Sequence, residues 1–533
     1  MKRVIILLPV FLCICIQLSA QMETGETVAV TRIDAGKVRG YIHNHIYTYK
    51  GIPYATAKRF EAPQKPQPWG DTVRSSMAYG PVAPVETPIN VTNDEGEFAF
   101  HHNWGFANED CLRVNVWTPG ISDGKNRPVM VWIHGGDFTE GSSQDLPSYD
   151  GENLAKKGDV VVVSLNHRLN ILGFLDLSAY GDKYKHSSNA GMLDIEAALK
   201  WVKTNIRSFG GNPDNVTIFG QSGGGAKVNT LMAMPSAKGL FQKAVSESGS
   251  YPWVMLSKAE KQALALEVLK VLRLKSSEVD SLQNIPYQQL ADAGKKAIQV
   301  MRDRMRDKNP YVDFYLNWAP GIDSIDMPYY VFSKEAFKLS AEVPLLIGTV
   351  KNEFTNSIYT GLVNASQDSV IAYIRKLYGA KSDSFIRAVK KAYPEDTKPT
   401  DLIDVDVTFR PGAVAVAEQK SALHAAPVYL YLFTWQSPVL DGKGKAFHCV
   451  ELPFVFNNIS RCEEFTGGGK EAYALADKVS SAWINFARWG NPNYKDLPQW
   501  PVYNAANTAT MHFDNTSVVR PQMDKELLDL VSQ

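Results

Sequence analysis

A serine flanked by small residues is the first candidate for catalysis in this 533-residue chain. Gly220-Gln221-Ser222-Gly223-Gly224 directly follows an apolar run at residues 216–219. A G-x-S-x-G sequence between a strand and a helix is typical of a nucleophile elbow, whose sharp turn needs small neighbours and holds the serine hydroxyl clear of the sheet. The following helix would present backbone amides to a reacting carbonyl. The pattern predicts a serine that attacks an acyl group.

Such a serine needs a base, because its hydroxyl is a weak nucleophile at neutral pH. We expect this base to come late in the chain, where the histidines are His424, His448 and His512. His448 follows the turn at residues 441–445, beyond a predicted strand at 428–433. His424 lies in a helical stretch and His512 among polar residues near the end of the chain, so we favour His448.

The base in turn needs a carboxylate that orients it. Glu353 follows a predicted strand at residues 343–347. Active sites of open parallel sheets gather at the carboxyl ends of the strands, which favours Glu353 as this acid. Taken alone, a loop carboxylate of this kind is more often simply solvated.

The elements that must position these residues alternate between strands and helices. Apolar runs predict strands at residues 129–133, 160–165, 216–219, 241–245, 343–347 and 428–433. Apolar residues at helical spacing predict a helix over 192–206. The charged stretch 258–308 predicts solvent-exposed helix on the surface of the domain. We therefore predict an α/β fold with a parallel sheet, as a single domain over residues 21–533 with helical insertions.

Composition excludes several classes of protein. Hydrophobic residues make up 44% and charged residues 21%, which are ordinary globular proportions. Lys+Arg and Asp+Glu both number 56, so no net field favours nucleic acid or an anionic membrane. Beyond residue 20 the cysteines are Cys111, Cys449 and Cys462, and their spacing is not that of a zinc site. Whether Cys449 and Cys462 form a disulfide is left open.

Residues 1–20 have the layout of a secretory signal peptide. Lys2 and Arg3 precede an apolar run at residues 4–16, and small residues follow at 19–20. This run is shorter than the ~20 residues that cross a bilayer, so a membrane anchor is the lesser alternative. We expect an exported protein, periplasmic or secreted.

Longer stretches are similar to those of a known family. Residues 209–213 with 220–224 resemble a serine signature, and residues 109–112 with 115–117 resemble a second signature. Further matches lie at residues 51–55, 59–60, 166–169, 189–194, 320–323, 448–454, 486–487, 490–493 and 500–501. Together they resemble the type-B carboxylesterase and cholinesterase family over nearly all of the mature chain.

The resemblance implies an α/β-hydrolase fold, a large and mostly parallel sheet with helices on both faces. It implies Ser222 as nucleophile, Glu353 as triad acid and His448 as base, with Ser248 supporting the triad by hydrogen bonding. The absence of an upstream disulfide partner for Cys111 departs from animal members and favours a bacterial-type exported esterase.

The oxyanion hole departs from the family pattern. The resemblance assigns its donors to the backbone N–H groups of Gly136, Asp137 and Gly223. Asp137 stands where the family usually has glycine or alanine, and Gly223 where it usually has alanine. The Asp137 carboxylate either faces away and caps a neighbouring amide, or it opposes the oxyanion and slows or narrows the esterase. A like charge ~4 Å away could cost ~4 kcal/mol at an effective dielectric near 20.

We expect two-step hydrolysis of small to medium esters, with no metal and no cofactor. By the resemblance, Phe314, Leu316 and Trp318 fall where the family builds its acyl pocket, and aromatic crowding there favours short acyl groups. Gln221 stands where many members carry Glu, so a charge that could favour cationic substrates is absent.

Two other functions remain open on the same scaffold. One is a non-catalytic binding protein, as adhesion members of the family are, although these usually lose a triad residue. The other is an amidase or peptidase that uses the same triad. The natural ester and the oligomeric state are left open.

Overall fold

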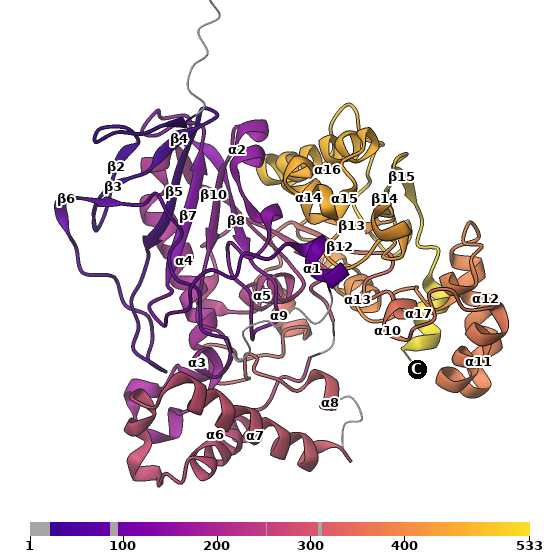
Figure 1. Cartoon of the computed structure of the whole chain (residues 1–533), viewed down its shortest axis with the longest axis horizontal. Coiled ribbons are helices and arrows are strands. Elements are labelled where there is room, and N and C mark those ends of the chain that lie inside the picture. The colour runs from indigo at the N-terminus through magenta and orange to yellow at the C-terminus, as the bar shows by residue number, and fades with distance from the viewer. Residues whose placement is uncertain (1–21, 86–93, 252, 308–311, 533) are drawn as a thin grey trace, which may run out of the picture.

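The computed structural model describes residues 22–85, 94–251, 253–307 and 312–532, so the predicted signal peptide lies outside it. Within these ranges, one sheet has twelve strands (Figure 1). In spatial order they are β1 (Met22–Glu23), β4 (Tyr41–His43), β5 (Ile46–Pro53), β7 (Arg113–Thr118), β9 (Val161–Leu165), β8 (Arg127–Ile133), β10 (Gly211–Gln221), β11 (Lys243–Glu247), β12 (Leu345–Val350), β13 (Val428–Phe433), β14 (Thr510–Phe513) and β15 (Val518–Arg520). A smaller sheet pairs β2 (Val30–Ile33), β3 (Gly36–Arg39) and β6 (Gly70–Ser75).

The centre of the large sheet is parallel, as predicted. Every neighbouring pair from β9 through β8 and β10 to β14 is parallel. The strands on either side of this block, β1, β4, β5 and β7 at one edge and β15 at the other, pair antiparallel. The carboxyl ends of β8, β10, β11, β12 and β13 therefore meet at one edge of the sheet, which is where the candidate residues follow.

The central strands are buried on both faces, and alternate residues enter different cores. In β8, Val129, Val131 and Ile133 belong to one hydrophobic cluster, and Met130 and Trp132 belong to another. The first cluster includes residues of α3, α4, α5 and α13, and the second includes residues of α2, α14 and α16. Helices thus cover both faces of the sheet.

The helices occupy the connections between strands and two larger insertions. They are α1 (Asp94–Phe100), α2 (Glu152–Gly158), α3 (Asn170–Phe174), α4 (Ala190–Asn205), α5 (Gly223–Met232), α6 (Lys258–Val271), α7 (Tyr287–Met305), α8 (Val312–Tyr315), α9 (Lys334–Leu339), α10 (Asn356–Tyr359), α11 (Gln367–Tyr378), α12 (Ser382–Ala392), α13 (Arg410–Ser421), α14 (Leu452–Val455), α15 (Glu463–Thr466), α16 (Lys470–Trp489) and α17 (Lys525–Val531). In Figure 1, α6 and α7 lie below the sheet, and α11, α12 and α17 group at the right.

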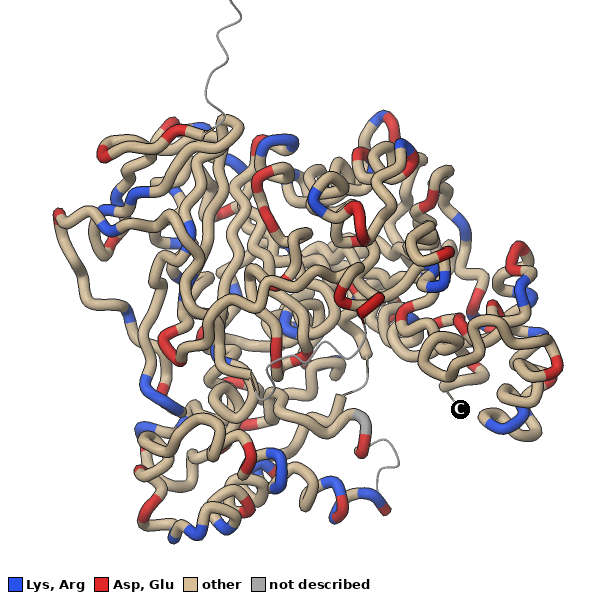
Figure 2. The backbone as a smooth tube through the Cα atoms, in the orientation of Figure 1, with Lys and Arg blue, Asp and Glu red and all other residues tan. Residues whose placement is uncertain are grey.

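Charged residues lie mainly on the outer elements. Figure 2 shows both signs intermixed along α6, α7, α11 and α12, with few charges on the central strands. In the part of the chain that the structure covers, none of the helices combines the length and apolarity that a membrane span needs.

Candidate active site

Ser222 occupies the turn between β10, which ends at Gln221, and α5, which begins at Gly223. Its backbone has φ 57° and ψ −125°, a combination that costs a non-glycine residue conformational energy and persists only where the surroundings enforce it. The glycines on either side allow this turn. A Cβ on Gly220 would lie 2.6 Å from Ile133 O, and one on Gly224 would overlap the same carbonyl.

Glu353 and His448 come together from two later parallel strands. Glu353 follows β12, and His448 lies on the loop between β13 and α14. His448 N donates to Glu353 O at 2.8 Å, and the Nδ1 of its ring is hydrogen-bonded to Glu353 Oε2. Ser248, which follows β11, donates from Oγ to Glu353 Oε1 at 2.7 Å, and Val350 N donates to the same oxygen at 3.1 Å.

These contacts fix the histidine tautomer. With Glu353 accepting from Nδ1–H, a neutral His448 ring has its lone pair on Nε2, which is the arrangement of a general base. Burial lowers the pKa of His448 to about 4, against smaller opposing effects of Glu451 and Asp406. Burial raises the pKa of Glu353, and the hydrogen bonds from Ser248 and Val350 oppose this by favouring the carboxylate.

The histidine ring is enclosed by aromatic rings and an amide. The ring centroids of Phe354 and Phe409 lie 4.8 and 5.2 Å from that of His448. Gln221 Nε2 is 3.4 Å from His448 Nδ1 and 3.3 Å from Nε2, and such similar distances place the amide against the ring face. Within the described residues, Ser222 Oγ has no side-chain hydrogen bond; catalytic hydrogen bonds often tighten only when substrate binds.

Gly136, Asp137 and Gly223 lie together beside the serine. Gly136 and Asp137 follow β8, and a Cβ on Gly223 would overlap the backbone of Asp137. The N–H group of each of these three residues shares a peptide with the carbonyl of the preceding residue, and that carbonyl accepts a hydrogen bond. Behind Asp137 N–H, Gly136 O accepts from Glu140 N at 3.0 Å; behind Gly223 N–H, Ser222 O accepts from Ala226 N at 2.9 Å. Gly135 O accepts from the His134 ring Nδ1 at 2.9 Å.

The Asp137 carboxylate is half-buried and hydrogen-bonded to a tyrosine. Tyr251 donates its hydroxyl to Asp137 Oδ1 at 2.6 Å. Burial raises the pKa of Asp137, against the opposing effects of the Tyr251 hydrogen bond, of Lys227 and of the Phe138 amide. The side-chain partner of this carboxylate is thus a tyrosine hydroxyl, and whether the carboxylate faces away from the oxyanion or opposes it stays a matter of prediction. The assignment of Asp137 to the oxyanion hole stays a prediction.

A cavity of about 430 Å³ opens beside the histidine. Glu353, Phe354, His448 and Cys449 contribute to its wall. The rest is mainly aromatic or aliphatic, including Phe100, Ile358, Tyr359, Leu440, Phe447 and Phe465. The wall also includes the charged residues Glu95, Lys443 and Glu464. A largely apolar cavity with a small number of polar groups is the usual form of a small-molecule site.

Of the residues predicted for the acyl pocket, Leu316 and Trp318 do not contribute to this cavity wall. Leu316 and Trp318 are each 1% exposed and belong to the hydrophobic core, where Trp318 packs against Gly294 of α7. The side chain of Phe314 lies outside the described part of the chain. Their role in substrate choice stays a prediction.

The cysteines Cys111, Cys449 and Cys462 are free, so Cys449 and Cys462 are not bridged in this structure. Cys449 instead donates to Gln221 Oε1 at 3.1 Å. Within the described residues, no cluster of His, Cys, Asp and Glu has the arrangement of a metal site.

Sequence reasoning missed three neighbours of the site: Gln221 as a contact of the His448 ring, Tyr251 as the partner of Asp137, and Lys227. Lys227 carried a signal, since it is the one charged residue in the stretch 222–234. Tyr251 carried none, because its contact spans 114 residues of sequence.

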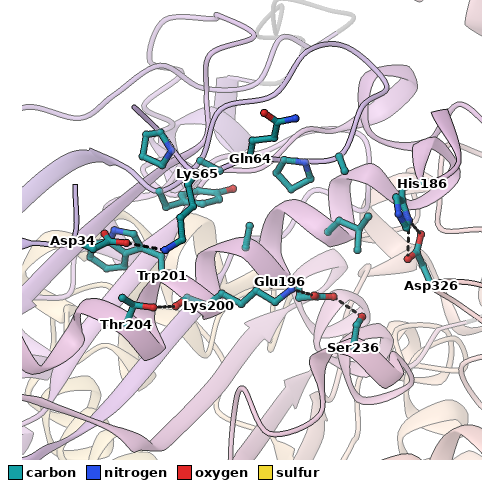
Figure 3. Close-up of a pocket in the computed structure, with 17 residues that line it drawn as sticks. Asp34, Gln64, Lys65, His186, Glu196, Lys200, Trp201, Thr204, Ser236 and Asp326 are labelled. Atoms are coloured by element: carbon teal, nitrogen blue, oxygen red, sulfur yellow. Dashed lines mark hydrogen bonds and ion pairs between the residues drawn. The ribbon is translucent and has the colours of Figure 1, made fainter. Parts of the chain in front are cut away.

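A second cavity, of about 380 Å³, has a wall to which none of Ser222, Glu353 and His448 contributes (Figure 3). The charged side chains in its wall are paired with one another. Lys65 contacts Asp34, Lys200 contacts Glu196, and His186 contacts Asp326. Its charged groups are thus neutralised by one another.

The parallel sheet, with a serine at the turn after β10 and a histidine and an acid after later strands, has the α/β-hydrolase fold. The chain belongs to the carboxylesterase family, whose model matches residues 26–530. It is 36% identical to para-nitrobenzyl esterase of Bacillus subtilis (strain 168) over 497 residues, covering 92% of this chain and 96% of that protein.

Two further similarities, to a second enzyme and to a solved structure, agree with membership of this family. Phenmedipham hydrolase of Pseudarthrobacter oxydans is 30% identical, with 91% of this chain and 95% of that protein covered. A solved esterase from anaerobic Clostridium hathewayi, described as able to hydrolyse aliphatic aromatic polyesters, superposes with a TM-score of 0.82 at 35% identity, covering 95% of this chain and 98% of that chain. The chain is accordingly a carboxylesterase that acts on small-molecule esters.

Proposed function

We propose that this carboxylesterase works by two-step acyl transfer through Ser222, His448 and Glu353. Ser222 Oγ attacks the ester carbonyl while His448 Nε2 accepts its proton. The N–H groups of Gly136, Asp137 and Gly223 stabilise the oxyanion, and His448 returns the proton to the departing alcohol. Water then attacks the acyl-serine by the same route and releases the acid.

The observation that carries this proposal is the hydrogen-bonded chain from Ser248 through Glu353 to His448, next to a serine in a strained turn. The chain occupies His448 Nδ1 and leaves Nε2, which has only the Gln221 amide nitrogen 3.3 Å away, as the nitrogen that can accept a proton. Glu353 is 2% exposed and Ser248 fully buried, so the orientation of the ring does not depend on mobile surface groups.

We further propose neutral esters with at least one apolar group as substrates. The cavity beside His448 is lined mainly by aromatic and aliphatic side chains, which favours an aromatic or alkyl group there. Two of the related proteins named above are a para-nitrobenzyl esterase and an esterase that hydrolyses aliphatic aromatic polyesters. The preference for short acyl groups expected from the residue types at 314–318 is part of this proposal, and the dependence of kcat/KM on acyl length tests it.

Hydrolysis of p-nitrophenyl acetate, butyrate and octanoate by the purified protein and by Ser222→Ala tests this proposal. We expect turnover of acetate and butyrate by the wild type, a loss of at least about 10³-fold in Ser222→Ala, and a lower kcat/KM for octanoate. Equal rates in the two proteins would contradict the role of Ser222. Faster cleavage of a matched p-nitroanilide than of the ester would favour an amidase instead.

A further inference from the structure

Lys227 lies on α5, just over one helical turn beyond Ser222, and is fully buried. Its Nζ donates to His134 O at 3.0 Å and to Gly135 O at 3.4 Å. An ammonium group inside a protein is costly unless it is paired or hydrogen-bonded. The position of Lys227 therefore calls for a reason beyond packing.

Ion pairing does not explain why a lysine is buried at this position. None of the ion pairs between residues that the structure describes includes Lys227. The titratable groups that face it are Asp137, His134 and His167. Asp137 is bonded to Tyr251, and the two histidine rings stack on each other with centroids 5.0 Å apart. The polar atoms that Lys227 does contact are two backbone carbonyls.

One of these carbonyls belongs to the peptide that supplies an oxyanion donor. Gly135 C=O and Gly136 N–H are opposite ends of one planar trans peptide. A donor that holds the carbonyl end fixes the direction of the N–H end. A positive charge at the carbonyl end also polarises the peptide, so that its N–H is a stronger donor to a developing negative charge.

We propose that Lys227 is a positioning residue for the oxyanion hole, which orients the Gly135–Gly136 peptide and strengthens Gly136 N–H as a donor. His134 Nδ1 holds the same carbonyl from the loop itself. Lys227 thus connects the helix that begins after the nucleophile to the loop that carries the other two donors. This inference rests on the proposed function, because it concerns the oxyanion of the same reaction.

The charge of Lys227 depends on pH. Burial lowers its pKa to about 7, and the nearby Asp137 opposes this. His134 and His167 are held neutral, because burial and Lys227 both lower their pKa. The ammonium form is therefore favoured at pH 6, where His448, with a pKa near 4, is neutral and able to act as base. Above pH 7 the charge of Lys227 is progressively lost.

The test compares Lys227→Met, which removes both donor and charge, with Lys227→Gln, which keeps a donor. Lys420→Met is the matched control, since Lys420 is another buried lysine, donates to Ser340 O and has a pKa that burial lowers to about 8. Each variant is assayed with p-nitrophenyl acetate at pH 6 and pH 8, alongside its melting temperature and its affinity for a trifluoromethyl ketone.

Loss of a whole oxyanion donor costs about 10²–10³-fold in kcat, so loss of support for one donor should cost about 10–100-fold. We expect that loss in Lys227→Met at pH 6, with KM within about twofold of wild type, and a smaller loss in Lys227→Gln. The ketone, which forms a tetrahedral oxyanion, should bind more weakly by a similar factor. At pH 8, where the wild type has lost the charge of Lys227, the kcat of wild type divided by that of Lys227→Gln should be closer to 1 than at pH 6.

Several results would overturn the inference. One is a wild-type kcat in folded Lys227→Gln together with unchanged affinity for the ketone. Another is an equal fall of kcat in Lys420→Met, which would make the effect a general consequence of losing a buried lysine. Absence of turnover by the wild type would instead overturn the proposed function, and the inference with it.

Discussion

The residue after the proposed nucleophile shows how closely the two sides of the proposed oxyanion hole approach each other. Gly223 lies against the backbone of Asp137, so that a Cβ at position 223 would overlap it. The usual alanine of the family therefore does not fit unless the loop moves. We predict that Gly223→Ala displaces the Asp137 amide and lowers kcat by about tenfold or more, because oxyanion donors act only at short range.

Steady-state kinetics with p-nitrophenyl acetate, on protein whose active sites have been titrated, checks this prediction. A kcat in Gly223→Ala within twofold of wild type would show that the loop yields to the added methyl group.

The pH dependence of the reaction follows from the burial of His448. Its pKa is lowered to about 4, so the neutral base persists at a pH where an exposed histidine is protonated. We predict that kcat/KM for a neutral ester stays high as pH falls through 6.5 and declines only at lower pH. A profile from pH 4 to 8 measures this, and a midpoint at or above 6.5 would contradict it.

At the scale of elements, the site depends on the close approach of α5 to β8. A Cβ on Gly224 would overlap Ile133 O, and one on Gly225 would lie 2.8 Å from Glu247 O. Gly224→Ala should therefore destabilise the fold by about 1–3 kcal/mol or more, because neither strand can retreat from the centre of the sheet.

Chemical denaturation gives the free energy of unfolding that tests this prediction. Gly469→Ala is its control, since a Cβ there meets only Glu471 Oε2, at 3.4 Å. We expect the control to lose less stability, about 1 kcal/mol or less, because Gly469 is the N-cap of α16, where alanine is only moderately less favourable than glycine. Equal stability of the two variants would mean that α5 is less tightly seated than its contacts indicate.

The strands near the site were predictable where apolar residues fill them. Residues 428–433 coincide with β13, and 129–133 lie within β8. Residues 216–219 cover only the later part of β10, whose start at Gly211–Asn215 has a turn-forming composition but pairs with Arg127 across a register shift. The expected strand at 241–245 is β11 (Lys243–Glu247), which ends in polar residues that are buried because Glu247 accepts from Trp483.

At the scale of the whole molecule, what escaped prediction depends on contacts distant in sequence. The antiparallel strands β1, β4, β5 and β7 are short or interrupted by a register shift, and they are stabilised by neighbours rather than by their own pattern. The order of Ser222, Glu353 and His448 could be inferred from strand ends and motifs. The contact of Tyr251 with Asp137 could not, because packing between distant segments decides it, and Lys227 was marked only by its charge within an otherwise uncharged stretch.

The C-terminal helix is tied to the sheet by a buried ion pair. Arg410 donates from Nε to Asp524 Oδ2 at 2.9 Å and from Nη1 to Tyr431 O at 3.2 Å, and both charged residues are almost fully buried. Burial opposes the ionisation of Asp524, but Arg410 outweighs it and lowers the pKa of that carboxyl. Removing the cation leaves a buried carboxylate without its partner.

We predict that Arg410→Met lowers the free energy of unfolding by about 3–5 kcal/mol. The control is Lys391→Ala, because Lys391 pairs with Glu526 of the same helix at the surface, where such pairs contribute about 0–1 kcal/mol. Urea unfolding measures both variants. A loss of less than 1 kcal/mol in Arg410→Met would show that the pair does not hold α17 in place.

The central claim is that Ser222 carries the acyl group during the reaction, and covalent labelling tests it most directly. The protein is treated with diethyl p-nitrophenyl phosphate and analysed by intact-protein and peptide mass spectrometry, with Ser222→Ala in parallel. The account predicts one phosphoryl group per chain, located on Ser222, with parallel loss of esterase activity and no label in the variant. A label on another residue, or full activity in a protein labelled at Ser222, would contradict it.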